Sequence, residues 1–541
     1  MNNSRFRNAL LVLYVLVGVA WSVSIPTFEA GDEPAHLEHV RFIAKEKRLA
    51  VILPPPHKPV GEGFQPPLYY AALAAVRQAF FGTNETPSIQ LRPDWKNDDR
   101  GCSAVWYQHH EEERFPFAGI AHEVHLLRLC SVFIGLIALW FLHQSLVTVF
   151  PDTSVVPCVA LAWAAFLPGF TFITAVLSND GLATALSAVA MAQAVRMVQG
   201  GRPLREWAWL GGVAGLGVLG KLTTVPISAG LCLALLWYER RNWRRGVACG
   251  GCFAAGLLAV SGWWFARNWI LYHDPIGWNV AVMVNPWTVL PPGYWSGERV
   301  LKDAHVCFSS YWGVFGYLSV SMNHWIYRAL YGVTLLGLLC AGWWIRREWR
   351  HWPDSTRRGV MVMLAAMAVG IVTLICQCAR NRLAQGRYLF PGYPAHALVV
   401  AMAAVCLGHV FMRRPVWVAR LACCLAGGLG AVLVLFRGPL LAATANGVRQ
   451  WFNWKPRTMT IEFYLNQGRW LYETGTGIAL GVALAAGVLW AWQARRAREN
   501  GEEAVARWWQ ERRFGLAMGW GLLMAGLNIF CLVKYLLPAY R

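Results

Sequence analysis

The sequence predicts an all-α polytopic membrane protein, and three observations support this class. The 541 residues are 56% hydrophobic and only 14% charged, whereas soluble proteins carry roughly 25% charged residues. Apolar runs of about 18 residues or more recur along the chain, and each can cross a hydrocarbon core of about 30 Å. Lys and Arg cluster in the short connections on one side of these runs, as the positive-inside rule predicts.

Thirteen transmembrane helices are predicted from the apolar runs. They begin near residues 8, 124, 154, 181, 207, 223, 247, 326, 358, 389, 416, 476 and 514. The first run is too long for a typical signal sequence, and no small-residue cleavage site follows it, so we expect a retained helix. The runs near 207 and 223 are short and are compatible with one broken pair.

Basic residues predict the orientation of these helices. Arg5 and Arg7 precede the first helix, and Arg clusters follow the sixth and the eighth. We therefore expect a cytoplasmic amino terminus. The net charge of +20 fits membrane lipid as a partner, and we expect no nucleic-acid partner, because the Arg residues form no soluble basic domain.

Most of the length outside the membrane is predicted on the outer side. The outer connections are residues 26–123, 270–325, 377–388 and 437–475. Within the first, residues 35–48 fit a surface helix, and residues 67–82 fit an interfacial helix that lies along the membrane. Residues 83–123 have the polar composition of an insertion. The loops and interfacial helices should form a cap, and we expect the protein to work on that side.

Two adjacent carboxylates, Asp32 and Glu33, follow the first helix at headgroup depth. A positioned carboxylate can act as general base for a hydroxyl nucleophile. The alternative is structural, since either residue can cap the helix that Pro34 begins. His36 and His39 lie one turn apart on that helix. They could orient the carboxylate, join a divalent metal site or serve as ordinary surface residues.

Two further outer segments carry residues that suit a sugar. Gln65 and Tyr69, in the segment Gln65–Tyr70, could hydrogen-bond a sugar, although tyrosines there also serve as membrane-interface anchors. Trp312, in the segment Trp312–Gly316, could form part of a wall on which a sugar stacks. Trp is abundant throughout the chain, so this last signal is weak by itself.

Polar and charged residues also gather at the outer ends of several predicted helices. These residues are Asn179, Asp180, Lys221, Arg267, Asn268, Asp274, Arg387 and Tyr388. Charges at membrane depth are costly and usually have a task. Lys221, Arg267 and Arg387 are suited to binding a lipid phosphate. The alternatives are snorkelling of each cation to the headgroups and simple helix capping by Asn179 and Asp180.

The chain has 14 cysteines, most of them in predicted membrane helices, where cysteine serves as a small apolar residue. Cys249 and Cys252 form a CxxC motif inside an apolar run without a second ligand pair, so we predict no metal site there. Cys102 and Cys307 both lie in outer loops, and the sequence leaves a disulfide between them open. No cofactor is predicted, and a divalent metal stays open.

The order of these motifs resembles the GT-C superfamily of bacterial membrane glycosyltransferases. Relatives of that family include protein O-mannosyltransferases and the aminoarabinose transferase that acts on lipid A. The resemblance covers roughly residues 8–410, and the polar insertion at 83–123 departs from the best-studied members. The motifs are Asp32-Glu33-Pro34, Pro66–Tyr70, Arg128, Asn179-Asp180, Arg267-Asn268, Asp274-Pro275, Trp312–Gly316 and Gln385–Tyr388.

The resemblance implies an inverting transfer of a sugar from a polyprenyl-phosphate donor on the outer, periplasmic face of a bacterial inner (cytoplasmic) membrane. The acceptor would be a lipid, a glycan or a protein. By position the general base is Asp32, with Glu33 as the neighbour that could replace it. We accordingly divide the chain into a catalytic transmembrane module, residues 1–412 with the outer loop 26–123, and carboxy-terminal helices, residues 413–541 with the outer loop 437–475.

Two alternative functions remain open at this point. A transporter or flippase of lipid-linked saccharides would also have many membrane helices and outer cations. Transporters often carry charges at mid-membrane and internal repeats, and in our assignment every Asp and Glu falls in a loop or at a helix end. A polysaccharide ligase is harder to separate, because it would share the GT-C-like architecture.

Overall fold

A computed structural model describes residues 3–82, 89–91, 97–98, 101–102, 106–110, 113, 115–153, 155–200, 202–291, 293–382, 384–413, 524–526 and 528–536. The chain divides into two compact units, one made of Met1–Ala404 with Phe514–Arg541 and the other of Val405–Arg513. The elements described below belong to the first unit, except residues 405–413, which end the helix that begins at Tyr393. The helices predicted near 416 and 476, the outer loop 437–475 and the division after residue 412 lie outside the described residues and stay predictions.

Seven helices in the described residues are long and apolar enough to cross a membrane. They are α1 (Asn3–Ser24), α4 (Gly119–Val149), α7 (Asp180–Gln199), α10 (Trp243–Tyr272), α13 (His324–Glu348), α14 (Asp354–Arg380) and the continuous run of η4 (Gly386–Gly392) with α15 (Tyr393–Arg413). The shorter helices are α8 (Leu204–Gly220), η2 (Leu222–Thr224) and α9 (Val225–Trp237). The all-α, multi-pass class is confirmed, and each run predicted to begin before residue 390 forms a helix.

The run predicted from residue 154 is broken by a sharp bend. Helices α5 (Val155–Ala165) and α6 (Pro168–Thr174) meet at an angle of 62°. Pro168 lies in the first turn of α6. Proline is tolerated there because an amide in the first turn has no acceptor within the helix. The bend carries the chain into the turn before α7, which contains Ser178 and Asn179.

Helices α8 and α10 pack closely through glycines. A Cβ atom on Gly211 would lie 2.0 Å from the carbonyl oxygen of Phe253, and one on Gly256 would lie 2.0 Å from that of Ala208. Small residues let helix backbones approach where lipid tails remove the hydrophobic drive for association. This contact therefore depends on the absence of side chains at both positions.

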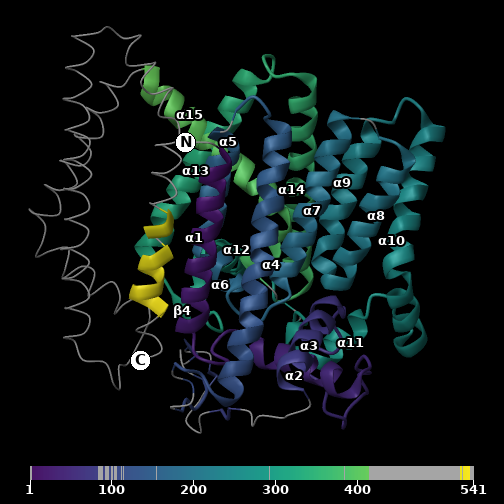
Figure 1. Cartoon of the computed structure of the whole chain (residues 1–541), viewed down its shortest axis with the longest axis vertical. Helices are drawn as coiled ribbons and strands as arrows, with labels where there is room; N and C mark the ends of the chain where they lie inside the picture. The colour runs from purple at the N-terminus through teal and green to yellow at the C-terminus, as the bar shows by residue number, and fades with distance from the viewer. Residues whose placement is uncertain are drawn as a thin grey trace, which may run out of the picture. The chain divides into compact units, whose positions relative to one another are not determined.

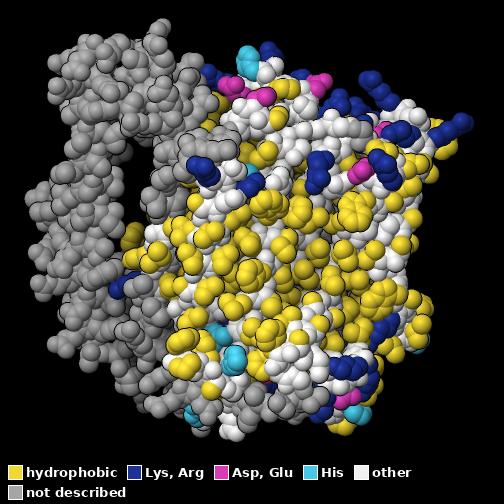
Figure 2. Space-filling view, viewed as in Figure 1, with side chains coloured by type: hydrophobic (Ala, Val, Ile, Leu, Met, Phe, Trp, Pro, Cys, Tyr) yellow, Lys and Arg dark blue, Asp and Glu magenta, His cyan; other side chains and the backbone are white. Residues whose placement is uncertain are grey.

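The surface of the helical bundle has the pattern expected of a membrane protein. Figure 2 shows hydrophobic side chains over the middle of the viewed face, with Lys and Arg most dense along the end that holds the amino terminus. Helix α13 exposes Leu335 and Leu339 at 61% and 64%. Exposed Leu side chains on a long helix suit contact with lipid tails rather than water.

The opposite end of the bundle carries the short elements, and we call it the site end. Helices α2 (Glu33–Glu46), α3 (Leu68–Phe81) and α11 (Trp278–Val284) lie there (Figure 1). The surface helix and the interfacial helix expected from the sequence correspond to α2 and α3, which pack against each other through Leu37, Val40 and Leu73.

The remaining elements are one longer helix, two short turns of helix and two small hairpins. They are η3 (Pro286–Thr288), α12 (Gly297–Gly313), η5 (Leu532–Leu536), the pair β1 (Asn97–Asp98) with β2 (Gly101–Cys102), and the pair β3 (Val314–Phe315) with β4 (Val320–Ser321). Both strand pairs are antiparallel and two-stranded. They close turns of the chain and add no sheet to the core.

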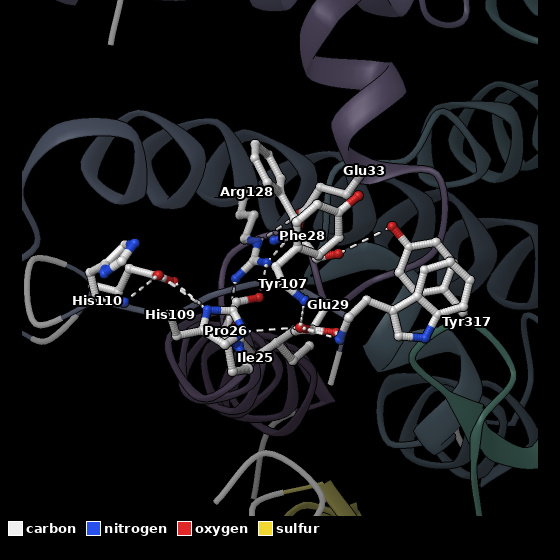
Figure 3. A network of polar contacts seen from close by, with 12 residues as sticks. Ile25, Pro26, Phe28, Glu29, Glu33, Tyr107, His109, His110, Arg128 and Tyr317 are labelled. Carbon is white, nitrogen blue, oxygen red and sulfur yellow. Dashed lines mark hydrogen bonds and ion pairs between the residues drawn. The ribbon is translucent and has the colours of Figure 1, made fainter. Parts of the chain in front are cut away.

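A buried ion pair holds the turn between α1 and α2. Glu33 accepts hydrogen bonds from Arg128 Nε at 2.7 Å and Nη2 at 2.6 Å, and both residues are 0% exposed. The backbone amides of Phe28 and Leu177 complete the set of donors to this carboxylate. Arg128 also donates to the carbonyl of Ile25 at 2.6 Å, so the end of α1 is bound to α4 (Figure 3).

A second buried carboxylate ties down the first loop at the site end. Glu29 accepts from the backbone amides of Trp106 and Tyr107 at 2.8 and 2.9 Å. Its Oε1 also lies 2.9 Å from Nε2 of His109, whose other ring nitrogen contacts Glu113 (Figure 3). Burial opposes the charge on His109, but the two carboxylates outweigh it and raise its pKa to about 9, so this bridge stays ionic at neutral pH.

We predict that Glu33→Gln destabilises the protein by about 3–5 kcal/mol, because it leaves the Arg128 charge buried without its counter-charge. Thermal unfolding of the purified protein in detergent measures the effect. The matched control is Glu46→Gln on the same helix, since Glu46 pairs with the exposed Arg48 at 3.6 Å. Such an exposed pair contributes at most about 1 kcal/mol. Equal melting temperatures for the two variants would contradict the structural role of Glu33.

Candidate functional site

Asp32 directs its carboxylate toward Arg387 instead of capping α2. It occupies the N-cap position of α2 with φ of 66°, and its side chain makes no capping hydrogen bond. A left-handed conformation at a non-glycine residue carries a cost that is often found at functional sites. The carboxylate remains 45% exposed and accepts a 3.0 Å hydrogen bond from Nη2 of Arg387. The capping alternative is therefore wrong for Asp32.

Arg387 joins Asp32 to a second carboxylate, Asp180. Nη1 of Arg387 lies 3.7 Å from Oδ2 of Asp180, and Nζ of Lys221 lies 2.6 Å from Oδ1 of the same group. Ser178 also donates to Asp180, at 3.1 Å. Asp180 begins α7, where the helix dipole favours a negative charge. We call Asp32, Asp180, Lys221 and Arg387 the charged cluster.

The charged cluster draws on four separate parts of the chain. Asp32 comes from the turn after α1, Asp180 from the start of α7, Lys221 from the junction of α8 and η2, and Arg387 from η4. Asp32 and Arg387 are 355 residues apart in sequence. All four residues are predicted individually from the sequence, and the structure brings them into one chain of ion pairs. Its two positive and two negative charges balance.

Asp32 is ionised at neutral pH. Its low-dielectric surroundings oppose ionisation, but the positive charges of Arg387 and Lys221 outweigh them and lower the pKa of the carboxyl below its usual value. An ionised carboxylate that keeps almost half of its side chain exposed can accept a proton from a bound molecule.

A hydrogen-bonded chain of polar side chains flanks the charged cluster. Glu62 accepts from the side-chain amide of Gln65, whose oxygen accepts from Nδ2 of Asn179. Nδ2 of Asn179 also lies 3.4 Å from the hydroxyl of Tyr70, which contacts Nδ1 of His36 at 2.9 Å. Burial lowers the pKa of His36 to about 3, so the ring is uncharged. The predicted residues Gln65, Asn179 and His36 thus meet beside Asp32.

Glu62 is a carboxyl that sequence reasoning missed. Burial and the neighbouring charge of Asp32 raise its pKa to about 7. It follows a loop rich in Pro, in no helix and beside no other acid, so no local pattern distinguishes it. Only the fold of residues 50–67 against α2, where the Glu62 amide donates to the Ala35 carbonyl at 3.2 Å, places it at the site.

Three of the predicted residues are buried and pack beneath the site without facing solvent. Glu33 is saturated by Arg128 and two backbone amides, so Asp32 is the carboxylate that faces outward. Tyr69 is 0% exposed, and its hydroxyl contacts Ser131 Oγ and the Ser178 amide. His39 is 1% exposed and packs 4.3 Å from the ring of Tyr70. In this arrangement these side chains position the turn before α7 and the start of α3.

The predicted residues at the end of α10 hold the neighbouring loops. Arg267 donates to the carbonyl of Ala50 at 2.6 Å, and Asn268 donates to that of Pro275 at 3.3 Å. Asp274 accepts from the amides of Ile276 and Asn279, which fixes the turn into α11. None of the ion pairs described above joins Arg267 to the charged cluster.

The other two predicted aromatic residues, Tyr388 and Trp312, have different surroundings. Tyr388 flanks the charged cluster, with its ring centre 5.9 Å from Nζ of Lys221 and 5.7 Å from Cζ of Arg387. Trp312 instead packs edge-on against Trp163 at 6.5 Å. The described residues contain no group of three or more His, Cys, Asp or Glu side chains arranged to hold a metal ion.

Comparisons with known proteins assign a family. Residues 120–396, just over half of the chain, match DUF2142, described as predicted membrane protein. The chain belongs to the DUF2142 family. The matched region contains Asp180, Lys221 and Arg387, whereas Asp32 and Glu62 precede it. No curated protein matches the sequence.

Solved structures show what fold this DUF2142 chain has. ArnT from Cupriavidus metallidurans bound to undecaprenyl phosphate superposes with a TM-score of 0.51 at 14% identity, over 97% of this chain and 77% of ArnT. Apo ArnT gives 0.50 at 14%, over 96% and 77%. The Archaeoglobus fulgidus oligosaccharyltransferase gives 0.44 at 13%, over 94% and 59%. At this identity the likeness to ArnT is one of fold, and it confirms the GT-C-type architecture.

We predict that Gly386→Ala displaces η4, the segment that carries Arg387. An added Cβ would lie 2.3 Å from the Cys307 carbonyl oxygen and 2.4 Å from the Tyr311 amide nitrogen of α12. Overpacking of this kind costs about 1–3 kcal/mol, which a lowered melting temperature would report. The control is Gly332→Ala on α13, where nothing lies within 4 Å of the added atom. Unchanged stability of Gly386→Ala would mean that η4 does not rest on α12.

Proposed function

We propose that the protein is a membrane glycosyltransferase of GT-C type that takes its sugar from a polyprenyl-phosphate donor. The observation that carries the proposal is Asp32, a half-exposed ionised carboxylate paired with Arg387 and close to a second cation, Lys221. This combination offers a general base and a phosphate site at one end of a membrane bundle. The shared fold with ArnT, solved bound to undecaprenyl phosphate, supports the choice of lipid carrier.

In the proposed reaction, Asp32 takes the proton of an acceptor hydroxyl as its oxygen bonds to the anomeric carbon. The bond from that carbon to the phosphate oxygen breaks on the opposite face, so the configuration at the carbon inverts. The hydroxyl is a poor nucleophile without a base, and a positioned carboxylate typically contributes about 10²–10⁴-fold to such a step. The products are the glycosylated acceptor and the polyprenyl phosphate.

Arg387 and Lys221 supply the charge that the leaving phosphate needs. The phosphate gains one negative charge as the sugar leaves, and cations held in a low-dielectric site stabilise such developing charge without reorganising. Arginine suits this role because its guanidinium can make two parallel hydrogen bonds to phosphate. Arg267, first considered for the same role, holds the Ala50 carbonyl and serves to fix the outer loop.

Donor binding also strengthens the base in this proposal. Arg387 holds the pKa of Asp32 down while the two are paired. A phosphate that draws the guanidinium away removes that stabilisation of the carboxylate, so the pKa of Asp32 rises. The base therefore gains proton affinity when the donor is in place, which couples chemistry to donor binding.

The setting we propose is the bacterial inner membrane, with the site end facing the periplasm. The dense Lys and Arg at the opposite end of the bundle support a cytoplasmic amino terminus (Figure 2). The acceptor belongs to one of three classes, a lipid, a glycan or a protein. A flippase or transporter of lipid-linked saccharides and a polysaccharide ligase are the outcomes that would replace this proposal.

We predict that the purified protein transfers sugar from one member of a panel of polyprenyl-phosphate sugars to acceptors in membranes. Asp32→Asn should lower the rate by at least about 100-fold because the base is lost. The control is Glu38→Gln, an exposed carboxylate on the same helix, which should transfer at the wild-type rate. Full activity in Asp32→Asn would overturn the assignment of the base. Movement of intact donor across proteoliposomes without transfer would favour a flippase.

The raised pKa of Glu62 predicts a pH dependence of donor binding. Below pH 7 the carboxyl is neutral, and above it an added negative charge faces Asp32, Lys221 and Arg387 and repels the donor phosphate. The KM for the donor should therefore rise as pH passes through about 7 in the wild type and stay level in Glu62→Gln. Glu38→Gln should keep the wild-type profile. An identical rise of KM in Glu62→Gln would show that another group titrates.

A further inference from the structure

Two cysteines meet at the contact between α12 and the end of α14. Sγ of Cys307 lies 3.8 Å from Sγ of Cys378, although 71 residues separate them in sequence. Both side chains are half-buried and both are free thiols. A disulfide bond has a sulfur–sulfur distance of about 2.05 Å, so a closure of about 1.8 Å separates this pair from a covalent link. The sequence alone allowed a disulfide between Cys307 and Cys102, so the neighbour of Cys307 in the structure differs from the partner considered there.

The pair lies beside the segment that carries Arg387 to the charged cluster. The Gly386 amide donates to Ser310 of α12 at 2.8 Å, and the carbonyl of Cys307 packs directly against Gly386. On the other side, the Arg382 amide donates to the carbonyl of Thr288 at 2.9 Å. The segment between the end of α14 and η4 is therefore held at Arg382 by Thr288 and at Gly386 by α12, close to both cysteines.

We propose that Cys307 and Cys378 are a modification site, a dithiol that is oxidised to an intramolecular disulfide at the site end of the protein. The bond joins α12 to the last turn of α14 and fixes the chain on both sides of residues 381–386. If the site end faces an oxidising compartment, as in the proposed topology, the disulfide is the resting form there. The disulfide itself does not depend on the glycosyltransferase assignment.

The oxidation needs an electron acceptor, which we name as a disulfide of a small thiol or of a thiol–disulfide oxidoreductase. One cysteine thiolate attacks that disulfide and releases the first thiol. The second cysteine then attacks the mixed disulfide, forms the Cys307–Cys378 bond and releases the second thiol. Two electrons and two protons pass from the pair to the acceptor, so two thiols are consumed and two are produced.

Asp303 is one of the groups that slow the start of this reaction. The contact with Cys378 and burial raise the pKa of the Cys307 thiol, and the negative charge of Asp303, one turn before it in α12, raises it further. The hydrogen bond with Cys307 lowers the pKa of the Cys378 thiol, and the charge of Asp303 opposes that shift as well. Attack requires a thiolate, so this carboxylate slows the first step. Asp303→Asn should therefore oxidise faster than the wild type under the same conditions.

The test uses the full-length protein in detergent with excess oxidised glutathione as the disulfide. The digest is then analysed by mass spectrometry without reduction. The expected result is a crosslinked peptide that contains Cys307 and Cys378 and disappears after dithiothreitol. Cys307→Ser and Cys378→Ser should each abolish it. Cys376→Ser, which removes an exposed thiol on the same helix, should leave it unchanged.

Three results would overturn the proposal. If both thiols can still be alkylated after full treatment with oxidised glutathione, they do not form a disulfide with each other. Glutathione bound to either cysteine in place of the crosslink would show that the second step fails. A crosslink of Cys307 to another cysteine in the wild type would assign a different partner. None of these readouts uses glycosyl transfer, so failure here is distinct from failure of the proposed function.

Discussion

The buried ion pair between Glu33 and Arg128 fixes the turn on which the rest of the site depends. Both side chains are 0% exposed. The Glu33 carboxylate accepts two hydrogen bonds from the Arg128 guanidinium and two from backbone amides. Breaking such a pair is costly because it leaves a bare charge in a low-dielectric interior. The pair holds the end of α1 against α4 and leaves the adjacent residue, Asp32, to point the other way.

The charged cluster then links this turn to the remote parts of the chain. Arg387 contacts Asp32 and Asp180, and Lys221 contacts Asp180, so two helix starts, one helix end and the first outer turn share one electrostatic network. Glu62, whose pKa is raised to about 7, borders it together with Gln65, Asn179 and Tyr70. In the proposed function, a donor phosphate would replace the carboxylate oxygens that now pair with Arg387 and Lys221.

The sequence predicted the class of fold and many of the site residues, each for a physical reason. Membrane helices follow from hydropathy, and Asp180, Lys221 and Arg387 were visible as charges where the membrane makes charges costly. Local pattern could not separate Asp32 from Glu33, since a left-handed φ of 66° at Asp32 decides which carboxylate is exposed. The position of Glu62 and the Cys307–Cys378 contact arise from packing between distant segments, so no local signal marks them.

The most direct measurement of the central claim is an electron cryo-microscopy structure of the full-length protein with undecaprenyl phosphate. The account predicts phosphate density within hydrogen-bond distance of both the Arg387 guanidinium and the Lys221 ammonium. It also predicts that the contact of 3.0 Å between Arg387 and Asp32 lengthens and that the Asp32 carboxylate faces the free side of the phosphate. Phosphate density away from these cations, with the Arg387–Asp32 pair unchanged, would contradict it.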